Sequence, residues 1–190
     1  MNLREQIERS HRESLAGMDI PWMLRQWYDR TPEKVCLVWC PFEGESQTFT
    51  YGGLYERAAQ LAAGLHDRGV EEGDFVLLHM DNSPEFVVSW YACAMLGAVA
   101  VSTNTRSVAR DLSYFVEVTQ AVCGLTQPRY ARLIRESCPG LRFLAVTDND
   151  AGSPIDDHQG VLDSVGGLAF GAMFAEQGIP AAPPDPERNL

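Results

Sequence analysis

A chain of 190 residues with 45% hydrophobic side chains is long enough to form one domain with a substantial core. Its net charge of −11 argues against general binding to nucleic acid, because phosphate backbones need basic partners. No segment reaches the roughly 18 consecutive apolar residues of a membrane span, and the N-terminus lacks the apolar region of a signal peptide, so we expect a cytoplasmic protein.

The first predicted elements are two helices and a hairpin. Apolar side chains share one side of a helix over residues 3–15, and a second helix runs from Pro21 to Thr31, where the next proline ends it. The aromatic residues of this second helix are more typical of a face packed on a core than of a ligand shelf. Residues 35–40 and 47–50 are predicted strands, and the turn-like segment between them favours a hairpin at one edge of the fold.

Helices and strands alternate over residues 48–106. Thr50 is the predicted cap of a helix whose apolar residues recur every three or four positions, until Gly69 ends it. A polar turn follows, and residues 75–78 then form a short apolar run that is typical of a buried strand.

The next helix has a strong N-terminal signal. Ser83 is the predicted cap, Pro84 occupies the first helical position, and Gly97 ends the helix. Strands and helices continue to alternate, which is typical of βαβ units and implies a mostly parallel sheet flanked by helices. The remaining predicted segments are strands at residues 99–101, 121–125 and 141–146 and helices at residues 107–119 and 128–138.

This pattern places the chain in the α/β class and suggests two parts. Residues 1–147 are predicted to form an α/β subdomain, and residues 148–190 a loop-rich tail. Within the tail we expect a short helix at residues 161–165 and a flexible loop where glycines occur between residues 166 and 171. Four prolines predict an extended or disordered segment at residues 180–186.

One long run carries a family resemblance. Residues 48–106 read TFTYGGLYERAAQLAAGLHDRGVEEGDFVLLHMDNSPEFVVSWYACAMLGAVAVSTNTR. The run contains, in order, a TY…L helix, G-V-x-x-G-D-x-V, N-S-x-E-F, G-A-V and N-x-R. This ordered set resembles the N-terminal region of the adenylate-forming acyl-CoA synthetases, most nearly the crotonobetaine/carnitine-CoA ligase-like subgroup. Gly53 departs from the pattern, because an acidic residue there would complete a capping box.

The resemblance implies an enzyme larger than this chain. Synthetases of this kind carry, after this region, a phosphate loop of the form TSGTTGxPK, and the 190 residues contain no such segment. We therefore expect the first part of an ATP-dependent carboxylate–CoA ligase, inactive by itself. The complete enzyme would use ATP, Mg²⁺, coenzyme A and a small-molecule carboxylate, and we expect this chain alone to bind none of them. A separately produced domain, a truncated gene product and one piece of a split enzyme all fit this expectation.

Three residues are candidates for ligand binding, and none is predicted to be catalytic. Arg106 follows the carboxyl end of a strand, where open α/β sheets place ligands, and the resemblance implies contact with a coenzyme A phosphate. A solvated or loop-bracing arginine is the alternative. Asn82 and Ser83 stand at a helix N-terminus and could hold an anion, although simple capping is the favoured explanation. His79, at the end of a strand, is predicted to be a core or boundary histidine.

The cysteines and one basic helix face are predicted to be structural. Cys36 and Cys40 lie four residues apart, but no second Cys/His pair lies at zinc spacing, so we expect no metal site. Cys93 and Cys123 fall in apolar segments and are predicted core residues, and an odd total of five cysteines fits a reducing compartment. Three arginines on the helix at residues 128–138 are predicted to be solvated, namely Arg129, Arg132 and Arg135.

Two functions from other classes stay open. The first is a non-catalytic binding or interaction module that associates with a partner chain, including self-association through an apolar face left bare. The second is a flavodoxin-like binding domain, which needs a phosphate-cradling loop after the first parallel strand. Residues 79–84 contain no glycine, which argues against such a loop.

Overall fold

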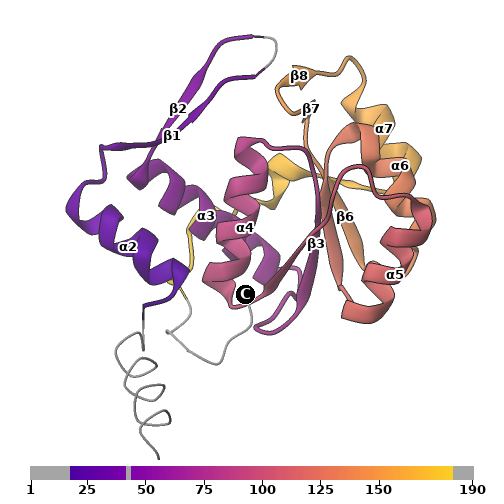
Figure 1. The fold of residues 1–190 in the computed structure, drawn as a ribbon, viewed down its shortest axis with the longest axis horizontal. Helices are drawn as coiled ribbons and strands as arrows, with labels where there is room; N and C mark the ends of the chain where they lie inside the picture. The colour runs from indigo at the N-terminus through magenta and orange to yellow at the C-terminus, as the bar shows by residue number, and fades with distance from the viewer. Residues whose placement is uncertain (1–17, 42–43, 182–190) are drawn as a thin grey trace, which may run out of the picture.

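The computed structural model describes residues 18–41 and 44–181, and within them a parallel sheet forms the centre of the fold (Figure 1). Its strand order is β4-β3-β5-β6-β9, and every neighbouring pair is parallel. The predicted α/β class and parallel sheet are therefore confirmed. The strands are β3 (Phe75–His79), β4 (Val99–Ser102), β5 (Cys123–Thr126), β6 (Phe143–Val146) and β9 (Leu168–Ala169).

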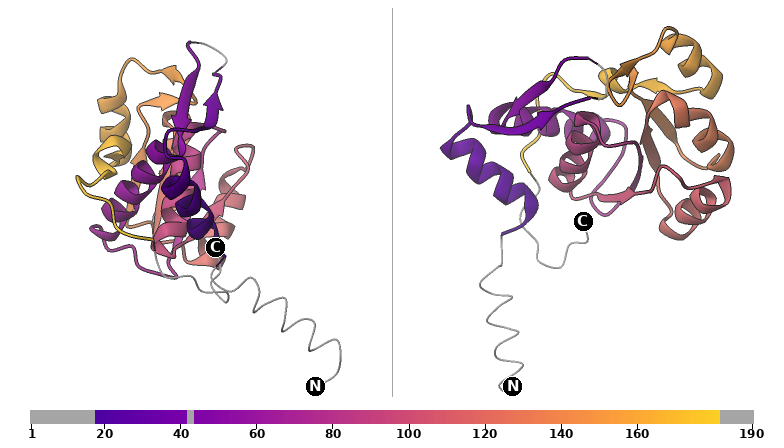
Figure 2. Two further views of the ribbon diagram at one scale, coloured as in Figure 1. Left: turned by 90° about the vertical axis from the view of Figure 1, so that its left-hand side faces the viewer. Right: turned by 45° about the horizontal axis from the view of Figure 1, so that its top comes forward.

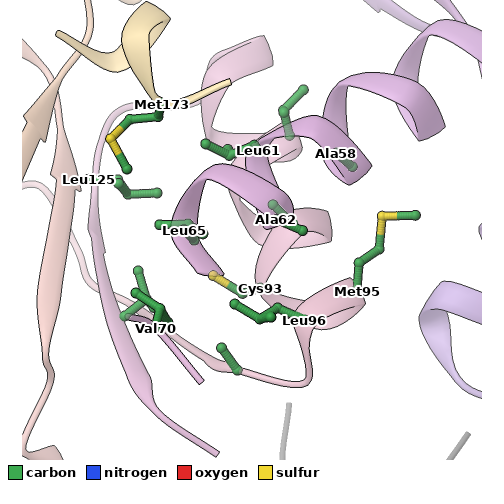
Figure 3. Packing of buried hydrophobic residues seen from close by; sticks show 14 of the residues in the cluster. Ala58, Leu61, Ala62, Leu65, Val70, Cys93, Met95, Leu96, Leu125 and Met173 are labelled. Carbon is green, nitrogen blue, oxygen red and sulfur yellow. The ribbon is translucent and has the colours of Figure 1, made fainter. Parts of the chain in front are cut away.

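Helices cover both faces of this sheet. On β3, Val76 and Leu78 pack in one buried cluster, whereas Leu77 packs in another, because successive side chains of a strand point to opposite faces. The first cluster includes α2 (Ile20–Arg30), α3 (Tyr51–His66) and α4 (Pro84–Leu96), as Figure 3 shows for α3 and α4. The second includes α5 (Ala109–Thr119), α6 (Pro128–Ser137) and α7 (His158–Val165).

The helix boundaries near the sheet follow the predicted caps. The Thr50 hydroxyl accepts a hydrogen bond from the Gly53 N–H at 3.1 Å, which fixes the start of α3. The Ser83 hydroxyl accepts one from the Phe86 N–H at 3.2 Å and starts α4. Gly97 ends α4 in the left-handed conformation, with φ of 79°, and turns the chain directly into β4.

The predicted hairpin is present, but it stands apart from the parallel sheet. Strands β1 (Val35–Trp39) and β2 (Gln47–Thr50) pair with each other in antiparallel fashion and form a two-stranded sheet of their own. The hairpin lies at an edge of the fold, as predicted (Figure 2), but it adds no strand to the parallel sheet. A smaller hairpin, β7 (Asn149–Asp150) with β8 (Ser153–Pro154), follows β6.

The prediction of a flexible loop at residues 166–171 is wrong. This segment contains β9, which pairs with β6 through Ala145 and Val146, and then the short 3-10 helix η1 (Phe170–Met173). The physical reason is tertiary: α7 returns the chain to the free edge of β6, and burial of Phe170 and Met173 holds it there. The division of the chain after residue 147 stays a prediction, and the sheet takes strands from both sides of it.

After η1 the chain crosses over α3. The Ala175 N–H donates to the Gln60 carbonyl at 3.1 Å, and the Ile179 N–H donates to the Ala59 carbonyl at 3.2 Å. The approach is so close that a Cβ on Gly64 would overlap the Met173 carbonyl. In Figure 3, Met173 and Leu125 lie beside Leu61 and Leu65, so this crossing closes the core over α3.

Some predicted features lie outside the described residues. These are the helix at residues 3–15 and most of the proline-rich segment at residues 180–186. The short helix predicted at residues 161–165 is confirmed as α7, which begins earlier, at His158. Across residues 18–41 and 44–181, no helix is both long enough and apolar enough to cross a membrane.

Candidate functional site

Loops at the carboxyl edge of the parallel sheet bring polar residues together. Because all five strands point the same way, the segments that follow β3, β4, β5 and β6 emerge at one edge of the sheet. Asp81 and Asn82 follow β3, residues 103–106 follow β4, Gln127 follows β5 and Asp150 follows β6. This edge contains all three residues that the sequence proposed as ligand contacts.

Asp81 is the centre of a network that the sequence did not predict. Its carboxylate accepts a hydrogen bond from the Tyr130 hydroxyl at 2.8 Å and lies 3.4 Å from an Arg129 guanidinium nitrogen. The Asp81 N–H donates to the Gln127 side-chain oxygen at 3.0 Å. Burial raises the pKa of Tyr130, and the hydrogen bond to the Asp81 carboxylate adds to this rise. Residues 49 positions apart are thus joined at one sheet edge.

The prediction of a solvated basic face on α6 holds in part, because Arg129 and Arg132 are exposed, but Arg129 and Arg135 also have partners in neighbouring loops. Arg129 bridges Asp81 and Asp150, with its Nε 3.3 Å from an Asp150 carboxylate oxygen and its backbone N–H donating to that carboxylate at 3.0 Å. Arg135 donates to the Val165 carbonyl at 2.7 Å and so ties α6 to the end of α7. Arg132 is exposed as predicted. The difference arises because the sequence pattern gave the helix face but not the loops that meet it.

His79 is fully buried, which confirms the prediction of a core histidine. Its Nδ1 lies 2.8 Å from the Thr103 hydroxyl, and its ring packs edge-on against Tyr130 with centroids 4.8 Å apart. Burial lowers the pKa of His79, while the nearby Asp81 carboxylate partly opposes this shift. His79 Nε2 and Gln127 Nε2 are both buried without a hydrogen-bond partner among the described residues.

The three predicted ligand contacts differ in how free they are. Ser83 is buried and its hydroxyl caps α4, so capping accounts for it. Asn82 is exposed beside that helix N-terminus. Arg106 is also exposed, and its backbone N–H donates to the Asn104 side-chain oxygen at 2.8 Å in the turn after β4. Arg106 and Asn82 therefore present side chains to solvent at the same sheet edge.

Two cavities flank Asp81 and Asn82. One cavity has a volume of about 500 Å³ and lies between the β1–β2 hairpin, α6 and the β7–β8 turn. Besides Asp81 and Asn82, its lining residues are Trp39, Cys40, Arg129, Asp150, Ala151 and Ser153. The other, of about 240 Å³, lies between the end of β3 and the loop after β4, where Thr103, Asn104 and Thr105 line it. The polar edge is thus accessible from two sides.

The cysteines behave as the sequence predicted for the core. Cys93 and Cys123 are buried, and burial raises the pKa of Cys93 to about 12. Cys40 is exposed and accepts a hydrogen bond from the Ser46 hydroxyl at 3.4 Å. Within residues 18–41 and 44–181, no group of three or more His, Cys, Asp or Glu side chains is arranged to hold a metal ion.

Comparison with known proteins places the chain in a family. Residues 24–186 match the family described as AMP-binding enzyme. The chain belongs to this family. The predicted resemblance to adenylate-forming acyl-CoA synthetases is therefore confirmed, and crotonobetaine/carnitine-CoA ligases are among the relatives.

Two curated relatives from the AMP-binding enzyme family show how much of such a protein the chain represents. The crotonobetaine/carnitine-CoA ligase of Salmonella paratyphi A is 32% identical over 117 residues, which are 60% of this chain and 23% of that enzyme. The Proteus mirabilis enzyme of the same name is 30% identical over 149 residues, which are 74% of this chain and 28% of that enzyme. The chain thus spans about a quarter of the length of the curated relatives it matches.

Solved structures support the same fold. The anthranilate CoA ligase AuaEII, crystallised with anthranoyl-AMP, superposes with a TM-score of 0.71 and 23% identity, over 88% of this chain and 30% of that chain. Acetoacetyl-CoA synthetase from Streptomyces lividans gives a TM-score of 0.72 and 23% identity, over 87% of this chain and 26% of that chain. At this identity the likeness establishes the fold of the AMP-binding family and no more.

Proposed function

We propose that residues 1–190 form the N-terminal portion of an ATP-dependent carboxylate–CoA ligase, which we call the complete ligase. The observation that carries this proposal is the match of residues 24–186 to the AMP-binding enzyme family, together with 30% identity to a crotonobetaine/carnitine-CoA ligase over 149 residues. A cytoplasmic location and a small-molecule carboxylate substrate belong to the same proposal.

The proposed reaction has two steps. A carboxylate oxygen attacks the α-phosphate of ATP, which forms an acyl-adenylate and releases pyrophosphate. The coenzyme A thiol then attacks the acyl carbon, forms the thioester and expels AMP. Mg²⁺ would stabilise charge on the phosphates in the first step, and we assign none of the residues described above to it.

Within this reaction, we assign Arg106 to a phosphate of coenzyme A. It is exposed at the carboxyl edge of the sheet, and the planar guanidinium can donate two hydrogen bonds to one phosphate. Asn82, exposed at the N-terminus of α4, is a second and weaker candidate for the same anion, because free N–H groups at a helix start favour negative charge. The Ser83 hydroxyl already caps the helix, so we assign Ser83 only to holding that end in place.

Arg106→Ala in the complete ligase tests this assignment. Loss of a bidentate phosphate contact should raise the KM for coenzyme A by about tenfold or more, because charge-assisted hydrogen bonds contribute about 1.5–3 kcal/mol. The KM for ATP should change by less than about twofold. Steady-state kinetics with each substrate varied in turn makes the measurement, and equal effects on ATP and coenzyme A would remove the role given to Arg106.

An interaction module is the second candidate function, and one observation favours it. Tyr114 and Val118 lie one turn apart on α5 and are both exposed, as is Leu168 on the edge strand β9. Exposed apolar groups of this kind can support association with a partner chain, including a second copy. A sedimentation coefficient that rises with the concentration of the chain would favour the module, and catalysis by the complete ligase would favour the enzyme.

A further inference from the structure

We propose that His79 and Tyr130 are positioning residues that hold the loop at residues 103–106, and with it Arg106, in place to receive a phosphate of coenzyme A. The inference rests on the function proposed above, because that function supplies the ligand. It adds two residues that touch no substrate and act through Arg106.

His79 anchors the start of the loop. The Thr103 hydroxyl lies 2.8 Å from His79 Nδ1 and 3.2 Å from the Leu78 carbonyl, so it joins the histidine ring to the backbone of β3. The Thr126 hydroxyl in turn donates to the His79 carbonyl at 2.7 Å. His79 is thus held from both sides of β3. Thr103, after β4, contacts its ring, and Thr126, on β5, contacts its backbone.

Tyr130 supports the His79 ring. The two rings pack edge-on with centroids 4.8 Å apart. The Tyr130 hydroxyl donates to the Asp81 carboxylate at 2.8 Å, and Arg129 contacts the same carboxylate, so the tyrosine ring is itself held in place. Tyr130 therefore acts on the loop through His79.

Arg106 depends on these anchors for its placement. Within the part of the chain that the structure describes, its guanidinium forms no hydrogen bond or ion pair, and its position is set through the backbone. The Arg106 N–H donates to the Asn104 side chain, and the Ser107 N–H donates to the Asn104 carbonyl at 2.9 Å. Asn104 directly follows Thr103, so loosening the contact between His79 and Thr103 frees the turn that presents Arg106.

The first test removes one oxygen from the network. Tyr130→Phe in the complete ligase should raise the KM for coenzyme A about fivefold, the usual effect of one lost hydrogen bond, with less than about twofold change for ATP. Thr103→Val, which removes the hydroxyl that contacts His79, should have the same effect. Tyr28→Phe, at a half-buried tyrosine of α2 that stacks on Tyr55, is the matched control and should leave both KM values unchanged. A KM for coenzyme A unaffected by both Tyr130→Phe and Thr103→Val would overturn the inference.

A second comparison addresses His79. The amide of Asn can reproduce the hydrogen bond at Nδ1 because it offers both a donor and an acceptor, whereas the amide of Gln reaches the position of Nε2. His79→Asn should therefore keep the KM for coenzyme A near that of the unaltered enzyme, and His79→Gln should raise it several-fold. Equal effects of the two variants would overturn the role of His79.

Combining variants separates this inference from the proposed function. If Tyr130 acts through Arg106, Tyr130→Phe adds nothing to the KM for coenzyme A once Arg106→Ala is present. Full additivity would contradict the inference. If Arg106→Ala raises only the KM for coenzyme A and Tyr130→Phe has no effect, the inference is wrong and the ligase proposal is unaffected. In the 190-residue chain itself, Tyr130→Phe should speed hydrogen exchange of the Arg106 amide about fivefold, and an unchanged rate would contradict the anchor independently of any ligand.

Discussion

Individual polar residues at the sheet edge explain why this region is ordered without being apolar. His79, Gln127 and Thr126 are buried, and each forms at least one hydrogen bond to a neighbouring strand or loop. Burying such groups is unfavourable unless they are hydrogen-bonded, so the network fixes one arrangement of the loops. As a consequence, the stability of the fold depends on the protonation state of His79, and this dependence can be measured.

His79 should make the stability of the fold depend on pH. Burial lowers its pKa below the ordinary 6.5, so the unfolded chain takes up a proton at higher pH than the folded chain. The contribution of His79 to the free energy of unfolding is therefore full above about pH 7 and falls as pH decreases through 6.5, by at most about 1.4 kcal/mol per pH unit. Urea denaturation between about pH 8 and 5.5 measures it.

The His79→Asn variant is the control for this experiment, because it keeps the hydrogen bond to Thr103 and removes the titrating group. Its stability should vary less with pH than that of the unaltered chain over the same range. Identical pH profiles would mean that His79 is not the group whose neutral form the fold requires. Asp81 and Tyr130 face His79 in both proteins, so their contributions cancel in the comparison.

Among the helices and strands, α3 is the element that joins the two ends of the described chain. It packs between α2 and α4, and the segment after η1 crosses its outer side at Gly64 and Ala59. Glycine is needed at position 64 because backbone meets backbone there, not because of its dihedral angles. Another glycine of the same helix, Gly53, has an ordinary environment, which provides a matched comparison.

Gly64→Ala should destabilise the fold by about 3 kcal/mol, because its Cβ would overlap the Met173 carbonyl and force the crossing segment away. Gly53→Ala should be neutral or stabilise by up to about 1 kcal/mol, because the nearest atom to its Cβ is the Thr50 hydroxyl at 3.6 Å and alanine favours a helix. Chemical denaturation gives both values. Similar stabilities for the two variants would show that the crossing over α3 does not hold in solution.

The elements that the sequence predicts well are those specified by local chemistry. Thr50, Ser83 and Gly97 act within one turn of their own positions, and the helices they bound are confirmed. Strand β9 was missed because its two residues follow glycines and become a strand only by pairing with β6. The hairpin was found from its turn, but its separation from the parallel sheet depends on packing that no local pattern encodes.

For the molecule as a whole, the same distinction applies to the candidate site. The sequence predicted Arg106 at the carboxyl end of a strand and Asn82 and Ser83 at a helix N-terminus, and the parallel strand order brings the three to one sheet edge. It did not pair Asp81 with Tyr130, which lie 49 positions apart, or Arg129 with Asp150. Polar residues directly after strands, such as Asp81 and Gln127, were the available signal. Partners from separate loops are recognisable only once the strand order is known.

Membership of the AMP-binding family over about a quarter of the length of its curated relatives gives the chain a clear place in the proposed enzyme. We propose that it supplies a scaffold and an edge that receives coenzyme A, and that the groups acting on ATP belong to other segments of the complete ligase. The 190-residue sequence contains no segment of the TSGTTGxPK form. The proposed function therefore predicts that these 190 residues alone release no pyrophosphate from ATP.

Pyrophosphate release measures this directly. The 190-residue chain and the complete ligase are each incubated with ATP, Mg²⁺, coenzyme A and a panel of small carboxylates, including crotonobetaine and carnitine, and pyrophosphate is followed by a coupled assay. We expect carboxylate-dependent release from the complete ligase and none above background from the chain alone. Turnover of ATP by the chain alone, or a complete ligase that releases no pyrophosphate and forms no thioester with any carboxylate tested, would contradict the account.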